Sequence, residues 1–138
     1  MDHSAPLTLG EIKREVDKRA RIIGASGLNN VLPTYGHSED FAQPYIMVDA
    51  QGYHYIIEER GQELRHDVTA KLDELLETIF VDITHELAGR WEASRRFLSG
   101  GNPRRALFKR QIELLERLSP SWAGRCLQRQ QEILKQSP

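Results

Sequence analysis

The stretch TAKLDELLETIFVDITHELAGRWEASRRFL, residues 69–98, decides the fold. Large apolar side chains recur in it every three or four positions, so they fall on one stripe of a helix. They are Leu72, Leu75, Leu76, Ile79, Ile83, Leu87 and Trp91. No other segment carries a periodic pattern of this length. We therefore predict one long central helix, with the other elements of a single domain, residues 1–138, packed against it.

Capping signals predict three further helices. Thr8 is followed three residues later by Glu11, which is the pattern of a capping box, and an N-terminal helix is predicted from there to Gly24. A polar residue directly before a proline marks the start of two C-terminal helices. These pairs are Asn102 with Pro103, and Ser119 with Pro120.

The region between the first helix and the central helix reads as a small antiparallel sheet. Residues 45–48 and 53–59 are rich in aromatic and β-branched side chains, and the short Asp-Ala-Gln-Gly segment between them predicts a hairpin. A third strand over residues 62–68 is an alternative that the sequence leaves undecided. Residues 28–43 show no period and predict a long loop, either functional or laid over the core. Strands grouped together and helices grouped together indicate the α+β class.

Charge is distributed unevenly along the chain. The net charge is −1, but residues 31–89 hold three basic and twelve acidic side chains, whereas residues 90–138 hold eleven basic and four acidic ones. An acidic region of this kind suits a basic partner. The alternative is that the two regions neutralise each other within the fold.

Composition favours a cytoplasmic protein without a membrane segment. No apolar run approaches the roughly 20 residues that span a bilayer. The N-terminus lacks the basic-then-apolar pattern of a secretory signal, and the one cysteine, Cys126, has no internal disulfide partner.

Signatures of catalysis and of metal binding are absent from the sequence. His85-Glu86 is followed by Gly89 at the position where a zinc protease has its second histidine. Glu58 and Glu59 are neighbours on a predicted strand, so they point to opposite faces and cannot share one substrate proton. We therefore expect no catalytic residue, no cofactor site and no metal site.

A basic cluster near the glycine pair at residues 100–101 supports an alternative function. Its members are Arg90, Arg95, Arg96, Arg104, Arg105, Lys109 and Arg110. The interleaved aromatic residues that would stack on bases are limited to Trp91, Phe97 and Phe108, which also suit a core. The alternative is thus a small nucleic-acid-binding regulator. A small enzyme with His54 or His85 in a deep pocket is a third possibility.

Short stretches between about residues 30 and 125 occur in a characteristic order. They are residues 32–36 (LPTYG), 44–49 (PYIMVD) with 52–55 (GYHY), 59–63 (ERGQE), 72–76 (LDELL) with 79–80 (IF), 105–109 (RALFK) with Gln111, and 118–122 (LSPSW). Together they resemble the immunity protein 63 family of bacterial polymorphic-toxin systems. The resemblance implies a cytoplasmic protein that binds and neutralises a toxin domain, usually encoded by an adjacent gene, without enzyme activity or cofactor. It supplies no toxin-binding residues and does not identify the toxin.

An acidic loop-and-hairpin region is the predicted toxin-binding site. Carboxylates there would steer a basic toxin surface into place, and tyrosines would anchor it. The predicted residues are Tyr35, His37, Glu39, Asp40, Asp49, Tyr53, Tyr55 and Glu58. The tyrosines have an alternative role, which is burial against the central helix. The sequence leaves open whether the protein forms a homo-oligomer through its C-terminal helices.

Overall fold

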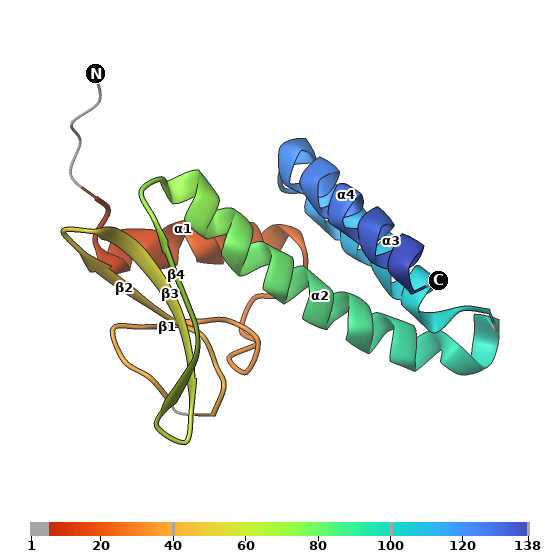
Figure 1. Cartoon of the computed structure of the whole chain (residues 1–138), viewed down its shortest axis with the longest axis horizontal. Helices are drawn as coiled ribbons and strands as arrows, with labels where there is room; N and C mark the ends of the chain where they lie inside the picture. Colours follow the sequence, from red (N-terminus) through yellow and green to blue (C-terminus); the bar gives the residue numbers. More distant parts are fainter. Residues whose placement is uncertain (1–5, 40, 100, 138) are drawn as a thin grey trace. The chain divides into compact units, whose positions relative to one another are not determined.

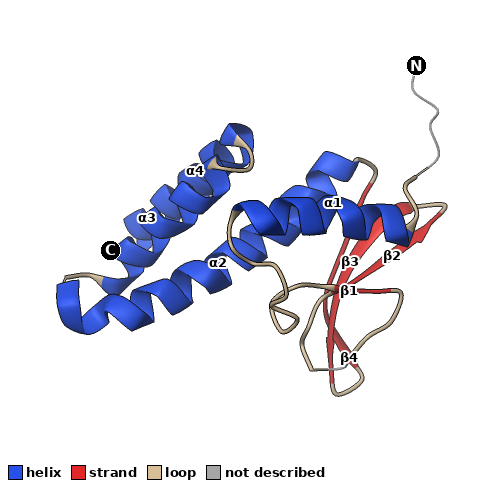
Figure 2. Ribbon diagram, turned by 180° about the vertical axis from the view of Figure 1, so that it is seen from behind, coloured by secondary structure: helices blue, strands red, loops and turns tan. Residues whose placement is uncertain are grey.

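The computed structural model describes residues 6–39, 41–99 and 101–137 and has the α+β architecture that the sequence predicts (Figures 1 and 2). The elements are α1 (Leu9–Ile22), β1 (Thr34–Tyr35), β2 (Tyr45–Asp49), β3 (Gly52–Glu59), β4 (Gln62–Thr69), α2 (Leu72–Ser99), α3 (Pro103–Glu116) and α4 (Pro120–Gln136). The chain divides into two units, residues 1–79 and 80–138, each with its own packing. The single domain stays a prediction.

Helix α1 begins as its capping box predicts. The Thr8 hydroxyl accepts a hydrogen bond from the Glu11 amide, and the Glu11 carboxylate accepts one from the Thr8 amide. The apolar face buries Ile12, Val16 and Ala20 completely. The helix therefore forms because its end is satisfied locally and one stripe is removed from water.

The sheet has four strands in the order β1-β2-β3-β4, so the prediction of two or three antiparallel strands is one strand short. The undecided third strand, residues 62–68, is present as β4, and it is antiparallel to β3. The missed strand, β1, pairs in parallel with β2. A two-residue strand is too short to show alternation, and long-range hydrogen bonds hold it, from the Thr34 amide to Pro44 and from the Gly36 amide to Ile46.

Cross-strand register sorts the side chains of the sheet onto two faces. Ile46 pairs with Tyr55, and Val48 with Tyr53; this covered face is buried at Ile46, Tyr53 and Tyr55, and α1 contacts β2. The other face carries Met47 and Val68, which remain partly exposed. We call it the open sheet face. It comprises Tyr45, Met47, Asp49, His54, Ile56, Glu58, Glu63, His66 and Val68, of which His54 and Ile56 are buried.

Residues 80–138 form a helical unit whose caps also match the prediction. The Asn102 side chain accepts from the amides of Arg104 and Arg105, and the Ser119 hydroxyl accepts from the Trp122 amide. Helices α3 and α4 lie side by side (Figures 1 and 2). Phe80 of α2 stacks on Trp122 of α4 with ring centroids 6.2 Å apart.

Helix α2 buries more than the single predicted stripe. Leu75, Leu76, Ile79 and Ile83 are buried as expected. A second row is buried beside them, four residues apart: Phe80, Thr84, Ala88 and Glu92. The helix also begins at Leu72 rather than residue 69, because Thr69 still pairs with Tyr53 in the sheet. No helix in the described part of the chain is long and apolar enough to cross a membrane.

Candidate interaction site

The eight residues predicted to bind a toxin do not form one cluster. Asp49 and Glu58 lie on the open sheet face, whereas Tyr53 and Tyr55 point from β3 to the covered face. Tyr35, His37 and Glu39 lie in or after β1. Asp40 lies outside the described residues.

Tyr53 and Tyr55 are structural in this fold. They are 5% and 2% exposed, so they offer almost no surface to a partner. The Tyr53 hydroxyl accepts a hydrogen bond of 3.0 Å from the Leu7 amide, just before α1. The guanidinium of Arg65 stands over the Tyr55 ring, 5.1 Å from its centroid. Both tyrosines therefore stabilise the packing of this unit and do not form a surface for a partner.

Tyr35 and His37 lie beside α1. They help to line a shallow hollow of about 380 Å³ to which Lys13 and Asp17 also contribute. Burial raises the pKa of Tyr35 above its ordinary value, and the negative charge of Asp17 adds to the effect. His37 is exposed and contacts the Glu39 carboxylate at 3.0 Å. This part of the predicted site is a loop-and-helix surface distinct from the open sheet face.

The open sheet face combines acidic groups with exposed apolar ones. Met47 and Val68 flank His54 in register and are 37% and 47% exposed. Asp49, Glu58 and Glu63 supply three carboxylates, and no lysine or arginine belongs to the face. A surface of this composition favours a partner that brings positive charge and an apolar contact.

A hydrogen-bonded chain of four side chains runs across this face. Asp49 Oδ1 lies 2.7 Å from His54 Nε2, His54 Nδ1 lies 2.7 Å from His66 Nε2, and His66 Nδ1 lies 3.0 Å from Glu63. The two imidazole rings therefore link the Asp49 carboxylate at one end of the chain to the Glu63 carboxylate at the other.

Both ends of the face hold their carboxylates in place. The hydrogen bond from His54 lowers the pKa of Asp49, with a smaller contribution from the Gln51 amide. At the other end the Tyr45 hydroxyl donates to Glu58, and this bond raises the pKa of Tyr45 to about 12. Asp49 is thus a fixed, ionised group at neutral pH, and the bond from Tyr45 holds the Glu58 side chain in place.

Sequence reasoning missed several members of this face, namely Met47, Glu63, His66 and Val68. Alternation along the hairpin places Met47 on the face of Asp49 and Tyr45, and that signal was available. Glu63, His66 and Val68 needed the register of β4, which a bulge at Ile57/Glu58 shifts. Phe41 was missed too; it is 83% exposed and bridges to Glu59 at the sheet edge.

The basic helices offer little for stacking on nucleic-acid bases. The guanidinium groups of Arg95 and Arg110 both lie 5.2 Å from the centroid of the Trp91 ring. The aromatic surface of Trp91 is therefore engaged within the fold. Phe108 lines a pocket and is half-buried.

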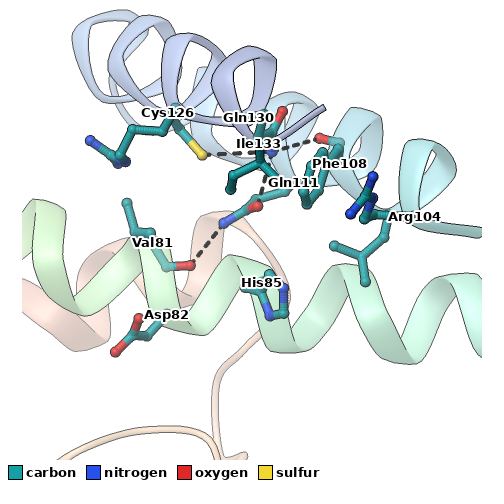
Figure 3. A pocket seen from close by; sticks show the side chains of 11 residues that line it. Val81, Asp82, His85, Arg104, Phe108, Gln111, Cys126, Gln130 and Ile133 are labelled. Carbon is teal, nitrogen blue, oxygen red and sulfur yellow. Dashed lines mark hydrogen bonds between the residues drawn. The ribbon is translucent and has the colours of Figure 1, made fainter. Parts of the chain in front are cut away.

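This pocket lies among α2, α3 and α4 and has a volume of about 590 Å³ (Figure 3). Apolar side chains supply much of its lining: Val81, Leu107, Phe108, Cys126 and Ile133. Arg104, Arg129, His85 and Asp82 add charge or polarity. Among the residues that the structure describes, no group of three or more His, Cys, Asp or Glu side chains is placed to hold a metal ion.

Comparison with protein families gives one match. The family model of immunity protein 63 matches residues 49–132, from the end of β2 to the later part of α4. This is more than half of the chain, and the chain therefore belongs to the immunity protein 63 family. Searches of curated proteins and of solved structures found no significant match. The matched range includes most of the open sheet face and excludes Tyr35, His37 and Glu39.

Proposed function

We propose that this protein is a cytoplasmic, non-catalytic immunity protein that binds and neutralises a cognate bacterial toxin domain encoded nearby. Membership of the immunity protein 63 family supports the role. The observation that supports a particular binding site is the composition of the open sheet face, where three carboxylates lie on the same face as the exposed side chains of Met47 and Val68. An inhibitor needs a fixed, complementary surface and no reactive group.

The proposed contact is centred on this face. Asp49, Glu58 and Glu63 steer a basic toxin surface into place. Because hydrogen bonds already hold these side chains, they lose little conformational entropy on association. Met47 and Val68 lose water on binding and supply the apolar part of the interface. Phe41 at the sheet edge is a further anchor.

The loop contributes a second, smaller region. Tyr35, His37 and Glu39 lie outside the residues that match the family, so we assign them contacts specific to this protein's own toxin. Tyr53 and Tyr55 are left out of the interface because they are buried. A basic toxin surface that normally holds an anionic substrate is the partner surface that fits best, because it would be blocked by this acidic face.

The test is a calorimetric titration of the purified protein with the C-terminal domain of the toxin encoded beside it. A one-to-one complex that abolishes the toxin's activity is expected. Met47→Ala combined with Val68→Ala should weaken this complex at least tenfold, whereas Leu127→Ala, an exposed apolar residue of α4, should not. An active, folded toxin domain that gives no heat would refute the pairing.

A further inference from the structure

The pocket among α2, α3 and α4 plays no part in the proposed toxin contact. We propose that it binds a small amphipathic carboxylic acid, with the carboxylate at Arg104 and His85 and the apolar chain along Val81, Cys126 and Ile133. The proposal rests on the helical unit alone and does not depend on the immunity function.

The size and lining of the pocket suit a small ligand. A volume of about 590 Å³ lies within the range of small-molecule sites. Five of the eleven lining residues are apolar or thiol side chains, and they come from all three helices. Such a lining takes up a hydrocarbon chain, and the few polar groups decide which head group can follow it.

Arg104 and His85 mark the head-group end. Neither side chain has a hydrogen-bond or ion-pair partner among residues 6–39, 41–99 and 101–137. An unpaired guanidinium beside apolar surface is suited to a carboxylate, because its planar N–H groups match both carboxylate oxygens. The imidazole of His85 adds a further donor.

The helix geometry brings these two residues to the same end. Gln111 of α3 donates to the Val81 carbonyl of α2, and Leu107 approaches Gly89, so the two helices run antiparallel here. His85 lies about 6 Å beyond Val81 along α2, and Arg104 about 10 Å before Gln111 along α3, in the same direction. Figure 3 shows Arg104 at the end of the pocket away from Val81 and Asp82, with His85 between them.

Asp82 sets the orientation of the ligand. It follows Val81 directly on α2 and lies toward the other end of the pocket from Arg104 (Figure 3). A ligand carboxylate placed there would meet a like charge, whereas an alkyl chain meets Val81 and Cys126. The acid is therefore bound with its head toward Arg104.

The pocket is formed before the ligand arrives. The buried amide of Gln111 donates to Val81 at 2.9 Å, and that of Gln130 donates to Gln111 at 3.1 Å and to the Phe108 carbonyl at 3.2 Å. These bonds tie α2, α3 and α4 together across the lining (Figure 3). A preformed pocket loses little conformational entropy on binding.

The probe is octanoate, titrated into the full chain by calorimetry and by amide NMR, with octanamide as the uncharged match. We expect saturable one-to-one binding of octanoate, with shifts at the pocket residues, and about tenfold weaker binding of octanamide. Arg104→Gln should weaken octanoate about tenfold and leave octanamide unchanged. Lys109→Gln, an exposed cation on the same helix outside this pocket, should change neither.

Three results would overturn the proposal. They are the absence of saturable octanoate binding, equal affinity for acid and amide, and equal losses in the Arg104 and Lys109 variants. A loss confined to Arg129→Gln would overturn the assigned orientation, because Arg129 is the other arginine of the lining. Unchanged unfolding curves for each variant establish that the fold is intact.

Discussion

At the scale of single residues, the fold depends on polar groups that are satisfied across elements. Gln111 and Gln130 are buried, and their amides bond to each other and to backbone carbonyls of α2 and α3. A buried amide is costly unless its bonds are made, so these residues fix one arrangement of the three helices. On the open sheet face, hydrogen bonds to His54 and His66 hold the carboxylates of Asp49 and Glu63 in place.

Gln111→Ala should lower the free energy of unfolding by about 2–4 kcal/mol. The change opens a cavity and removes the hydrogen bonds that Gln111 makes to the Val81 carbonyl and to the Gln130 amide. Gln128→Ala on the exposed side of α4 is the matched control and should stay within about 0.5 kcal/mol of the parent. Urea unfolding of both variants measures the difference. Equal stabilities would show that the buried glutamine bonds contribute nothing.

The pKa of Asp49 predicts an acid-dependent loss of stability. Because the pKa is lowered in the folded state, the ionised carboxylate stabilises the fold above the pKa of the unfolded chain. That contribution disappears as the pH falls through the folded-state pKa. Asp49→Asn should therefore be less stable than the parent at neutral pH and converge with it in acid. Urea unfolding at a series of pH values tests this, and a gap that is constant with pH would contradict it.

At the scale of elements, turns and caps decide where strands and helices begin and end. All three predicted caps, Thr8, Asn102 and Ser119, accept the expected backbone hydrogen bonds. These elements were predictable because a cap is a local signal. Strand β1 and the register shift between β3 and β4 were not, since both depend on pairing between separate segments. The second buried row of α2 likewise appears only when its neighbours are placed.

Two glycines of the sheet should respond differently to substitution. A Cβ at Gly52, where φ is +128°, would lie 2.4 Å from the Thr69 carbonyl oxygen. A Cβ at Gly61, where φ is +75°, would meet nothing within 4 Å. Gly61→Ala should therefore cost only the conformational strain of about 1–2 kcal/mol, and Gly52→Ala clearly more. Thermal or urea unfolding compares the two, and an equal loss would contradict the close approach.

At the scale of the whole molecule, the uneven charge of the sequence becomes a fixed acidic surface in one unit and a charged pocket in the other. The acidic character of the hairpin could be predicted from residues 31–89. Which side chains share a face could not, because only the register of β4 brings Glu63 and His66 beside His54. The burial of Tyr53 and Tyr55 could not be predicted either, because composition alone does not distinguish a tyrosine that contacts a partner from one that packs in the core.

The salt dependence of toxin binding tests the central claim most directly. The dissociation constant is measured by calorimetry from low to high salt for the parent and two triple variants. One carries Asp49→Asn, Glu58→Gln and Glu63→Gln on the open sheet face. The other carries Glu86→Gln, Glu113→Gln and Glu132→Gln on exposed helix positions and loses the same charge.

We predict that the parent and the helix variant bind alike and weaken as salt rises, because the interface is electrostatically steered. The open-face variant should bind at least about tenfold more weakly at low salt and lose most of its salt dependence. Unfolding curves establish that both variants are folded. If the open-face variant keeps the parent's affinity and salt dependence, this face does not bind the toxin.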